Sequence, residues 1–122
     1  MIKNLLLVGL GGGIGSMARY AASLLIKSKS FPYATLSVNI IGSFIIGLVL
    51  AISIKETGVA TNWKLFLATG ICGGFTTFSA FSLENMELLQ NGKIGMAVTY
   101  VLLSITLGIV ATFLGYMLVF KN

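Results

Sequence analysis

The chain lacks most of the residue types that catalysis and metal binding require. Its 122 residues include no histidine, and its only acids are three glutamates. Such a chain holds no nucleophile–base pair and no cluster of metal-ligating side chains. We therefore expect no enzymatic activity. The single cysteine, Cys72, has no second cysteine with which to form an internal disulfide.

Charge is also scarce. Charged residues make up 9% of the chain and hydrophobic residues 57%, whereas soluble domains carry about 25% charged residues. Lipid is therefore the expected solvent, and a cell membrane the expected location. The formal net charge is +5, but the cations stand singly at the ends of apolar segments, as interfacial anchors do. We therefore expect no nucleic-acid partner.

Four apolar segments predict four transmembrane helices in one domain over residues 1–122. The segments cover roughly residues 5–26, 33–54, 63–89 and 94–120, and a spanning helix needs about 20 residues. Short polar turns separate them, and no linker or low-complexity tract is present. The expected fold is an all-α membrane protein.

The third segment is predicted to be broken near its centre, where Gly73-Gly74 and Thr76-Thr77 stand in an apolar run. Glycine can adopt backbone angles closed to other residues, and threonine hydroxyls can satisfy the backbone groups that a break frees. Non-helical backbone at this depth survives only where it is buried in protein or lines a cavity, and ions or substrates bind at such breaks. The segment therefore indicates a protein that holds or moves an ion.

The positive charges divide evenly between the two sides of the membrane. With four spans, one side carries Lys3, Lys55, Lys64 and Lys121, and the other carries Lys27, Lys29, Lys93 and, nearest to them, Arg19. An excess of Lys and Arg normally sets orientation, and here there is none. The even division predicts insertion in both orientations, after which two opposite copies could pair as an inverted repeat. Alternatively, one or two residues outside the assigned loops decide the orientation.

Two spans carry small polar residues at helical spacing. Residues four apart share one face of a helix, and two sets have this spacing: Thr35, Asn39 and Ser43 in the second span, and Tyr100, Ser104 and Gly108 in the fourth. Because asparagine in hydrocarbon must form a hydrogen bond, bonding between helices is one interpretation. For the second span we favour a face that lines a water-accessible path. The fourth-span stripe, continued by Thr112 and Gly115, could equally be a packing seam.

The first span combines glycines with a cation. The pairs Gly9/Gly13 and Gly11/Gly15 have the spacing of small residues at close helix crossings. Arg19 stands near the end of the span, where arginine often extends to the membrane surface. The alternative is a vestibule cation that draws anions toward a pore.

Aromatic and acidic residues follow the predicted break. Phe78 and Phe81 lie three apart on one helical face. Such a pair usually belongs to a core, but beside a membrane break the positive ring edge can face an anion without binding it too tightly. Glu84 is the only acid that could carry a proton within a span. A passive path lined by amide, hydroxyl and ring-edge groups fits this inventory and suits a small anion.

Together, three stretches make the chain resemble the Fluc (CrcB-type) fluoride channel family over essentially its whole length. They are Gly11-Gly12-Gly13-x-Gly15-x-x-x-Arg19-Tyr20, Thr35-Leu36-x-Val38-Asn39-x-x-Gly42-Ser43-Phe44-x-x-Gly47 and Gly70-x-x-Gly73-Gly74-Phe75-Thr76-Thr77-Phe78-Ser79-Ala80-Phe81-Ser82. The resemblance implies a fluoride-selective channel of a prokaryotic cell membrane that exports fluoride down its electrochemical gradient. It also implies an antiparallel, dual-topology homodimer with two pores.

The resemblance further implies roles for individual residues. The implied fluoride pore contains Asn39, Phe78, Phe81, Tyr100 and Ser104, with Thr35 and Ser82 as neighbours. Arg19 and Glu84 are implied near its mouths. A structural Na⁺ at the dimer interface is implied on the backbone carbonyls of Gly73 and Thr76 from each subunit. Ala80 departs from the family, which often has threonine there, so throughput could differ.

Two other functions remain open at this stage. A small dual-topology exporter of cationic drugs would need an acid in the first span, where the only charge is Arg19. A non-conducting membrane assembly protein would show no ion flux. The residues favour the channel over both.

Overall fold

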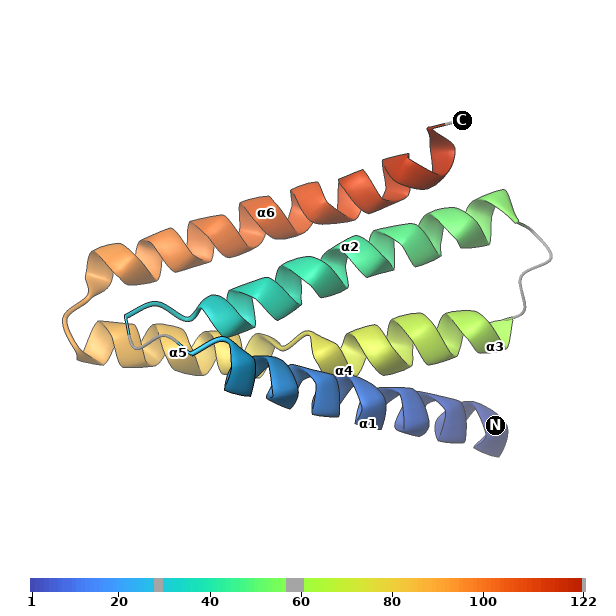
Figure 1. Ribbon diagram of the computed structural model, residues 1–122, viewed down its shortest axis with the longest axis horizontal. Helices are drawn as coiled ribbons and strands as arrows, with labels where there is room; N and C mark the ends of the chain where they lie inside the picture. The colour runs from blue at the N-terminus through green and yellow to red at the C-terminus, as the bar shows by residue number, and fades with distance from the viewer. Residues whose placement is uncertain (28–29, 57–60, 122) are drawn as a thin grey trace.

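The computed structural model describes residues 1–27, 30–56 and 61–121, and the only regular secondary structure among these is helical. The elements in chain order are α1 (Ile2–Leu25), α2 (Tyr33–Lys55), α3 (Thr61–Lys64), the π-helix η1 (Leu65–Cys72), α4 (Gly73–Phe75), α5 (Phe78–Gln90) and α6 (Ile94–Phe120). They form one bundle of long helices with both termini at the same end (Figure 1). Lys29, counted above in the charge balance, lies outside the described residues.

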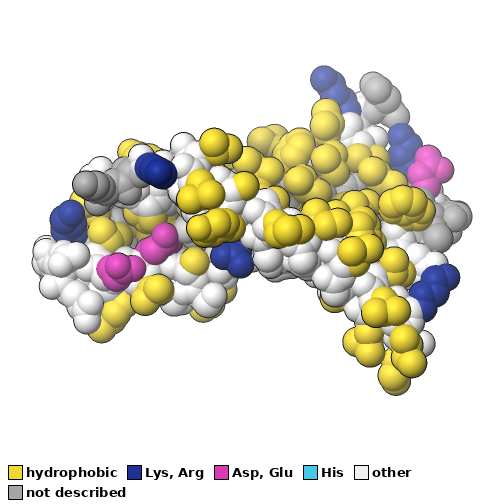
Figure 2. Space-filling model, turned by 60° about the horizontal axis from the view of Figure 1, so that its bottom comes forward, with side chains coloured by type: hydrophobic (Ala, Val, Ile, Leu, Met, Phe, Trp, Pro, Cys, Tyr) yellow, Lys and Arg dark blue, Asp and Glu magenta, His cyan; other side chains and the backbone are white. Residues whose placement is uncertain are grey.

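Four helical stretches are long and apolar enough to cross a membrane. They are Ile2–Leu25, Tyr33–Lys55, Asn62–Gln90 and Ile94–Phe120, so each predicted boundary is right to within about three residues. Most large apolar side chains point outward. Figure 2 shows them covering much of the surface, with Lys and Arg mostly toward its two ends. Helices that are apolar all round require an apolar solvent, which confirms the multi-pass membrane fold.

The break in the third span lies at Thr76 and Thr77. Thr76 is extended with φ −81° and ψ 154°, and Thr77 with φ −150° and ψ 122°. The prediction that the glycine pair supplies unusual backbone angles is wrong. Gly73 is in the ordinary α conformation, and among the described residues only Gly92 has a positive φ. Threonine itself supplies the break, because its β-branched side chain favours extended backbone.

The glycines serve close packing instead. A Cβ added to Gly74 would collide with the carbonyl oxygen of Gly12 in α1, and one added to Gly15 would collide with the carbonyl oxygen of Ile71. Gly11 packs just as tightly on the third span, which confirms the predicted Gly11/Gly15 pair as a packing motif. These contacts fix the first half of the third span against α1 and thereby set where the break falls.

The π-helix η1 keeps this contact in register. The α1 glycines touch the backbone of Phe66, Ile71 and Phe75, and the first and last of these are nine positions apart. An α-helix turns about 100° per residue, so residues nine apart would point to opposite sides. The wider π-helix lets both ends of the segment face α1. The contacts with α1 therefore fix how the third span is rotated where it reaches the break beside α2.

On the other side, α6 packs closely on α2. A Cβ on Gly47 would collide with the carbonyl oxygen of Thr112, and one on Gly115 with the carbonyl oxygen of Phe44. The Thr112 hydroxyl lies 3.0 Å from the Ser43 carbonyl oxygen and 3.1 Å from that of Gly108. The packing-seam interpretation of Thr112 and Gly115 is therefore confirmed. Toward the break, residues of the same two helices line a pocket.

Candidate functional site

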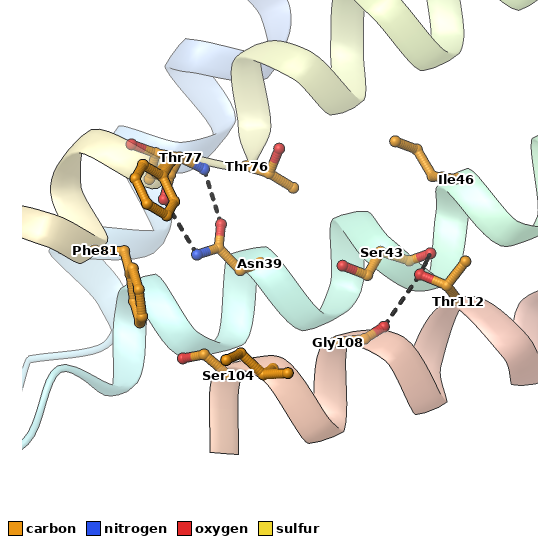
Figure 3. A pocket seen from close by; sticks show the side chains of 11 residues that line it. Asn39, Ser43, Ile46, Thr76, Thr77, Phe81, Ser104, Gly108 and Thr112 are labelled. Atoms are coloured by element: carbon orange, nitrogen blue, oxygen red, sulfur yellow. Dashed lines mark hydrogen bonds between the residues drawn. The ribbon is translucent and has the colours of Figure 1, made fainter. Parts of the chain in front are cut away.

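A pocket of about 350 Å³ with polar groups in a largely apolar wall lies between α2, the break, the start of α5 and the middle of α6 (Figure 3). It is lined by Asn39, Ser43, Ile46, Thr76, Thr77, Phe78, Phe81, Ser104, Ile105, Gly108 and Thr112. Four of the predicted pore residues meet here, namely Asn39, Phe78, Phe81 and Ser104. The pocket is therefore the candidate site.

Asn39 closes the broken backbone with its side chain. Its Oδ1 accepts a hydrogen bond from the Thr77 N–H at 2.8 Å, and its Nδ2 donates to the Thr77 carbonyl at 3.2 Å (Figure 3). The amide thus serves as the partner that a neighbouring backbone would provide, as membrane depth requires. Nδ2 carries two hydrogens, so one donor remains for the pocket.

The threonine hydroxyls satisfy further groups at the break, as predicted. The Ala80 N–H donates to Thr77 Oγ1 at 3.1 Å, which caps α5, and Thr76 Oγ1 donates to the Cys72 carbonyl at 2.8 Å. In a continuous helix, the Gly73 carbonyl would accept from Thr77 N–H and the Thr76 carbonyl from Ala80 N–H. Both N–H groups donate elsewhere, so these two carbonyl oxygens have lost their helical donors.

The two phenylalanines differ in exposure. Their ring centroids lie 5.8 Å apart. The Phe81 ring packs at 4.9 Å on the Tyr100 ring, edge to face, and is partly buried. Phe78 is 78% exposed although it lies in a membrane span. Both rings therefore line the pocket, but Phe81 is packed into its wall whereas Phe78 is largely exposed.

Ser104 presents an unpaired hydroxyl. Its Oγ is buried and, among the described residues, makes no hydrogen bond. Leaving such a group unpaired costs about 1–3 kcal/mol. An anion in the pocket would supply the missing acceptor.

Tyr100 and Thr35 lie outside the lining of this pocket. Their hydroxyls donate to the two oxygens of Glu84, each at 2.9 Å, and both residues are buried. The carboxylate thus joins α2, α5 and α6 beside the pocket. Ser82 is exposed and also lies outside the pocket lining.

Arg19 is held at the break. Its Nε donates to the Gly74 carbonyl at 3.2 Å. A backbone oxygen just before the break therefore receives a charged donor. Arg19, Glu84 and Thr77 line one small cavity of about 180 Å³. Thr77 also lines the main pocket, so the break stands between the two spaces.

Thr77 was predicted to satisfy the break, but it was not predicted to pair with Asn39 in the pocket. The sequence analysis treated the two features separately, as an asparagine that needed partners and a break that freed backbone groups. The structure shows that these two features bond to each other although they lie 38 residues apart in the chain.

Four apolar spans, one of them broken, carry amide, hydroxyl and ring-edge groups into one pocket. This arrangement defines a multi-pass membrane protein built to hold or pass a small ion. Comparison with known proteins agrees with this class. The family model described as "CrcB-like protein, Camphor Resistance (CrcB)" matches residues 6–116. The chain belongs to this family, as the sequence motifs predicted.

Several bacterial relatives match nearly end to end. One from Azobacteroides pseudotrichonymphae is 47% identical, with 97% of each chain covered. One from Flavobacterium psychrophilum is 46% identical over 93% of this chain and 94% of its own. One from Thermus thermophilus is 46% identical over 96% and 95%. All three are named fluoride-specific ion channel FluC.

Proposed function

We propose that this protein is a fluoride channel that lets the anion leave a prokaryotic cell passively. The observation that carries the proposal is the pocket itself, which offers the free Nδ2 hydrogen of Asn39, the unpaired hydroxyl of Ser104 and the ring of Phe81. A pore must replace the water that a small anion loses, but must not bind the ion too tightly. Neutral donors meet both requirements. The names of the relatives point to the same ion.

Fluoride efflux from loaded proteoliposomes, followed with a fluoride electrode, tests this function. The protein should release fluoride down its gradient, with a potassium ionophore present to balance the charge. Chloride loaded at the same concentration should stay inside. An exporter of cationic drugs or an assembly protein would release no more fluoride than protein-free liposomes do.

We propose further that two copies pair in opposite orientations. Two features of the chain favour this. The Lys and Arg residues divide four against four between the membrane sides. In addition, Phe78 and Gly73, which flank the break, are exposed on the single chain. A partner would bury both residues, and an inverted partner would need no charge bias.

Cysteine labelling in intact cells tests the orientation. In a Cys72→Ser background, Asn4→Cys and Asn91→Cys place thiols at opposite ends of the bundle without changing the charge balance. With dual insertion, an impermeant maleimide should label about half of each variant. Full labelling of one variant and none of the other would show a single orientation.

We propose that the carbonyls of Gly73 and Thr76 help to hold a structural Na⁺. Both oxygens lack their helical donors because Asn39 and Thr77 engage those N–H groups, and carbonyl oxygens at unwound helices suit this hard cation. When bound, the ion would supply positive charge to the break. We expect replacement of Na⁺ by N-methylglucamine to lower the melting temperature of the detergent-solubilised protein by several degrees. An unchanged melting temperature would contradict the site.

A further inference from the structure

The pocket continues into a groove along α2 and α6. A second cavity of about 620 Å³ shares Ser43, Ser104, Gly108 and Thr112 with the first and extends to Tyr116. Ser104 and Thr112 stand eight residues apart on α6, which is about 12 Å along the axis. Gly108, midway between them, has no side chain. A dehydrated anion in the groove therefore meets a gap in the hydroxyls of α6.

Thr112 does not offer a donor at the far side of this gap. Its hydroxyl lies at hydrogen-bond distance from the carbonyls of Ser43 and Gly108 (Figure 3). A hydroxyl has one hydrogen to donate, and these backbone oxygens already receive it. The next donor after Ser104 must come from another helix.

Ser43 of α2 fills the gap. A Cβ added to Gly108 would lie 3.7 Å from Ser43 Oγ, so the serine hydroxyl stands beside the place that a side chain at 108 would occupy. Ser43 lines both cavities. Within the described part of the chain its hydroxyl has no hydrogen-bond partner. On the basis of the proposed function, we propose that Ser43 donates to fluoride in the path, in place of a hydroxyl at Gly108.

The contrast with Ser53 on the same helix supports this role. Serine in a membrane helix commonly donates to the carbonyl four residues earlier, and Ser53 does so, to Val49 at 2.8 Å. Ser43 makes no such bond. Close packing of α2 on α6 is maintained one turn further on by Gly47, so that contact does not need the Ser43 hydroxyl.

Substitution and rescue test the proposal by fluoride efflux from proteoliposomes. We expect Ser43→Ala to slow efflux about tenfold, the effect of losing one hydrogen bond to the ion in transit. Adding Gly108→Ser should restore most of the rate, because it returns a hydroxyl to the same space from the facing helix. Ser53→Ala is the matched control and should conduct normally. Elution from size exclusion shows whether each variant is folded.

Each outcome decides the question. Normal efflux by Ser43→Ala would overturn the proposal while leaving the fluoride function intact; absence of efflux in the unmodified protein would reject the function itself. If Gly108→Ser alone is active but does not restore efflux to Ser43→Ala, the role of Ser43 is packing and the proposal is overturned. Where Gly108→Ser alone is inactive, the isosteric pair Ser43→Thr and Ser43→Val decides. Faster efflux with threonine supports the donor, and equal rates overturn it.

Discussion

Replacing Asn39 with aspartate is expected to stop fluoride efflux, with a loss of at least 100-fold. The two side chains have nearly the same shape, so the change is chemical. A carboxylate brings a negative charge to the pocket, and two unit charges 4 Å apart interact by about 4 kcal/mol at an effective dielectric constant of 20. An oxygen would also replace the Nδ2 group that donates to the Thr77 carbonyl. Two oxygens would then oppose each other at the break.

Two comparisons separate these causes. The Asn39→Ala variant loses the clamp on Thr77 without adding charge, so residual efflux above that of Asn39→Asp measures the effect of the charge. Acid pH should partly restore Asn39→Asp, because protonation makes the new carboxyl neutral. Protein-free liposomes correct for leakage of hydrogen fluoride. If Asn39→Asp conducts normally at neutral pH, Asn39 is only a helix-packing residue.

The amino-acid sequence predicts the spans well because bilayer thickness fixes their length. About 20 apolar residues are needed to cross, and few other structures have that signature. Asn39 was also found as a pocket residue from spacing, because polar groups four residues apart share a face of a helix. Ser104 was assigned to the pore through the family resemblance, because the spacing in the fourth span equally allowed a packing seam. Both signals are local in the chain. Both predictions hold in the folded protein because lipid surrounds the helices and adds few competing contacts.

The break was located correctly and the role of the threonine hydroxyls was predicted, but the glycine pair was given the wrong role. Gly74 could have served either an unusual backbone angle or a close approach, and composition does not distinguish the two. The contact with Gly12 decides for close approach, and it depends on how α1 packs. Threonine favours extended backbone through its β-branched side chain, but threonine also occurs within helices, so the residue type alone does not place a break. At Thr77 the extended backbone is stabilised by two hydrogen bonds to the side chain of Asn39, on another helix.

The partners of Glu84 show a second limit. Thr35 and Tyr100 were assigned to the pore from their positions in the motif, and both donate to this carboxylate in the single chain. The spacing of residues along a helix predicts which way their side chains point, but not which group they contact. A side chain on that face can therefore reach either the pocket or a neighbour beside it. Their place in fluoride conduction stays a prediction. It can be measured by the same efflux assay.

Replacing Phe81 with isoleucine is expected to reduce fluoride efflux at least 100-fold while the protein stays folded. Phe81 lines the pocket together with Asn39 and Ser104. The edge of its ring carries partial positive charge, which can face a dehydrated anion where no cation is present. Isoleucine keeps an apolar side chain of similar bulk but has no such edge. The main loss at the wall of the pocket is therefore the positive ring edge.

Folding should change little in this variant. The edge-to-face contact between Phe81 and Tyr100 contributes about 0.5–1.5 kcal/mol beyond area burial, and the remaining apolar volume is retained. Phe66→Ile is the matched control, because Phe66 makes a similar aromatic contact with Trp63 and lies outside the pocket lining. Equal efflux from both variants would remove the ring edge from the mechanism. Loss confined to Phe81→Ile, with matching melting temperatures, would place the dehydrated ion at that ring.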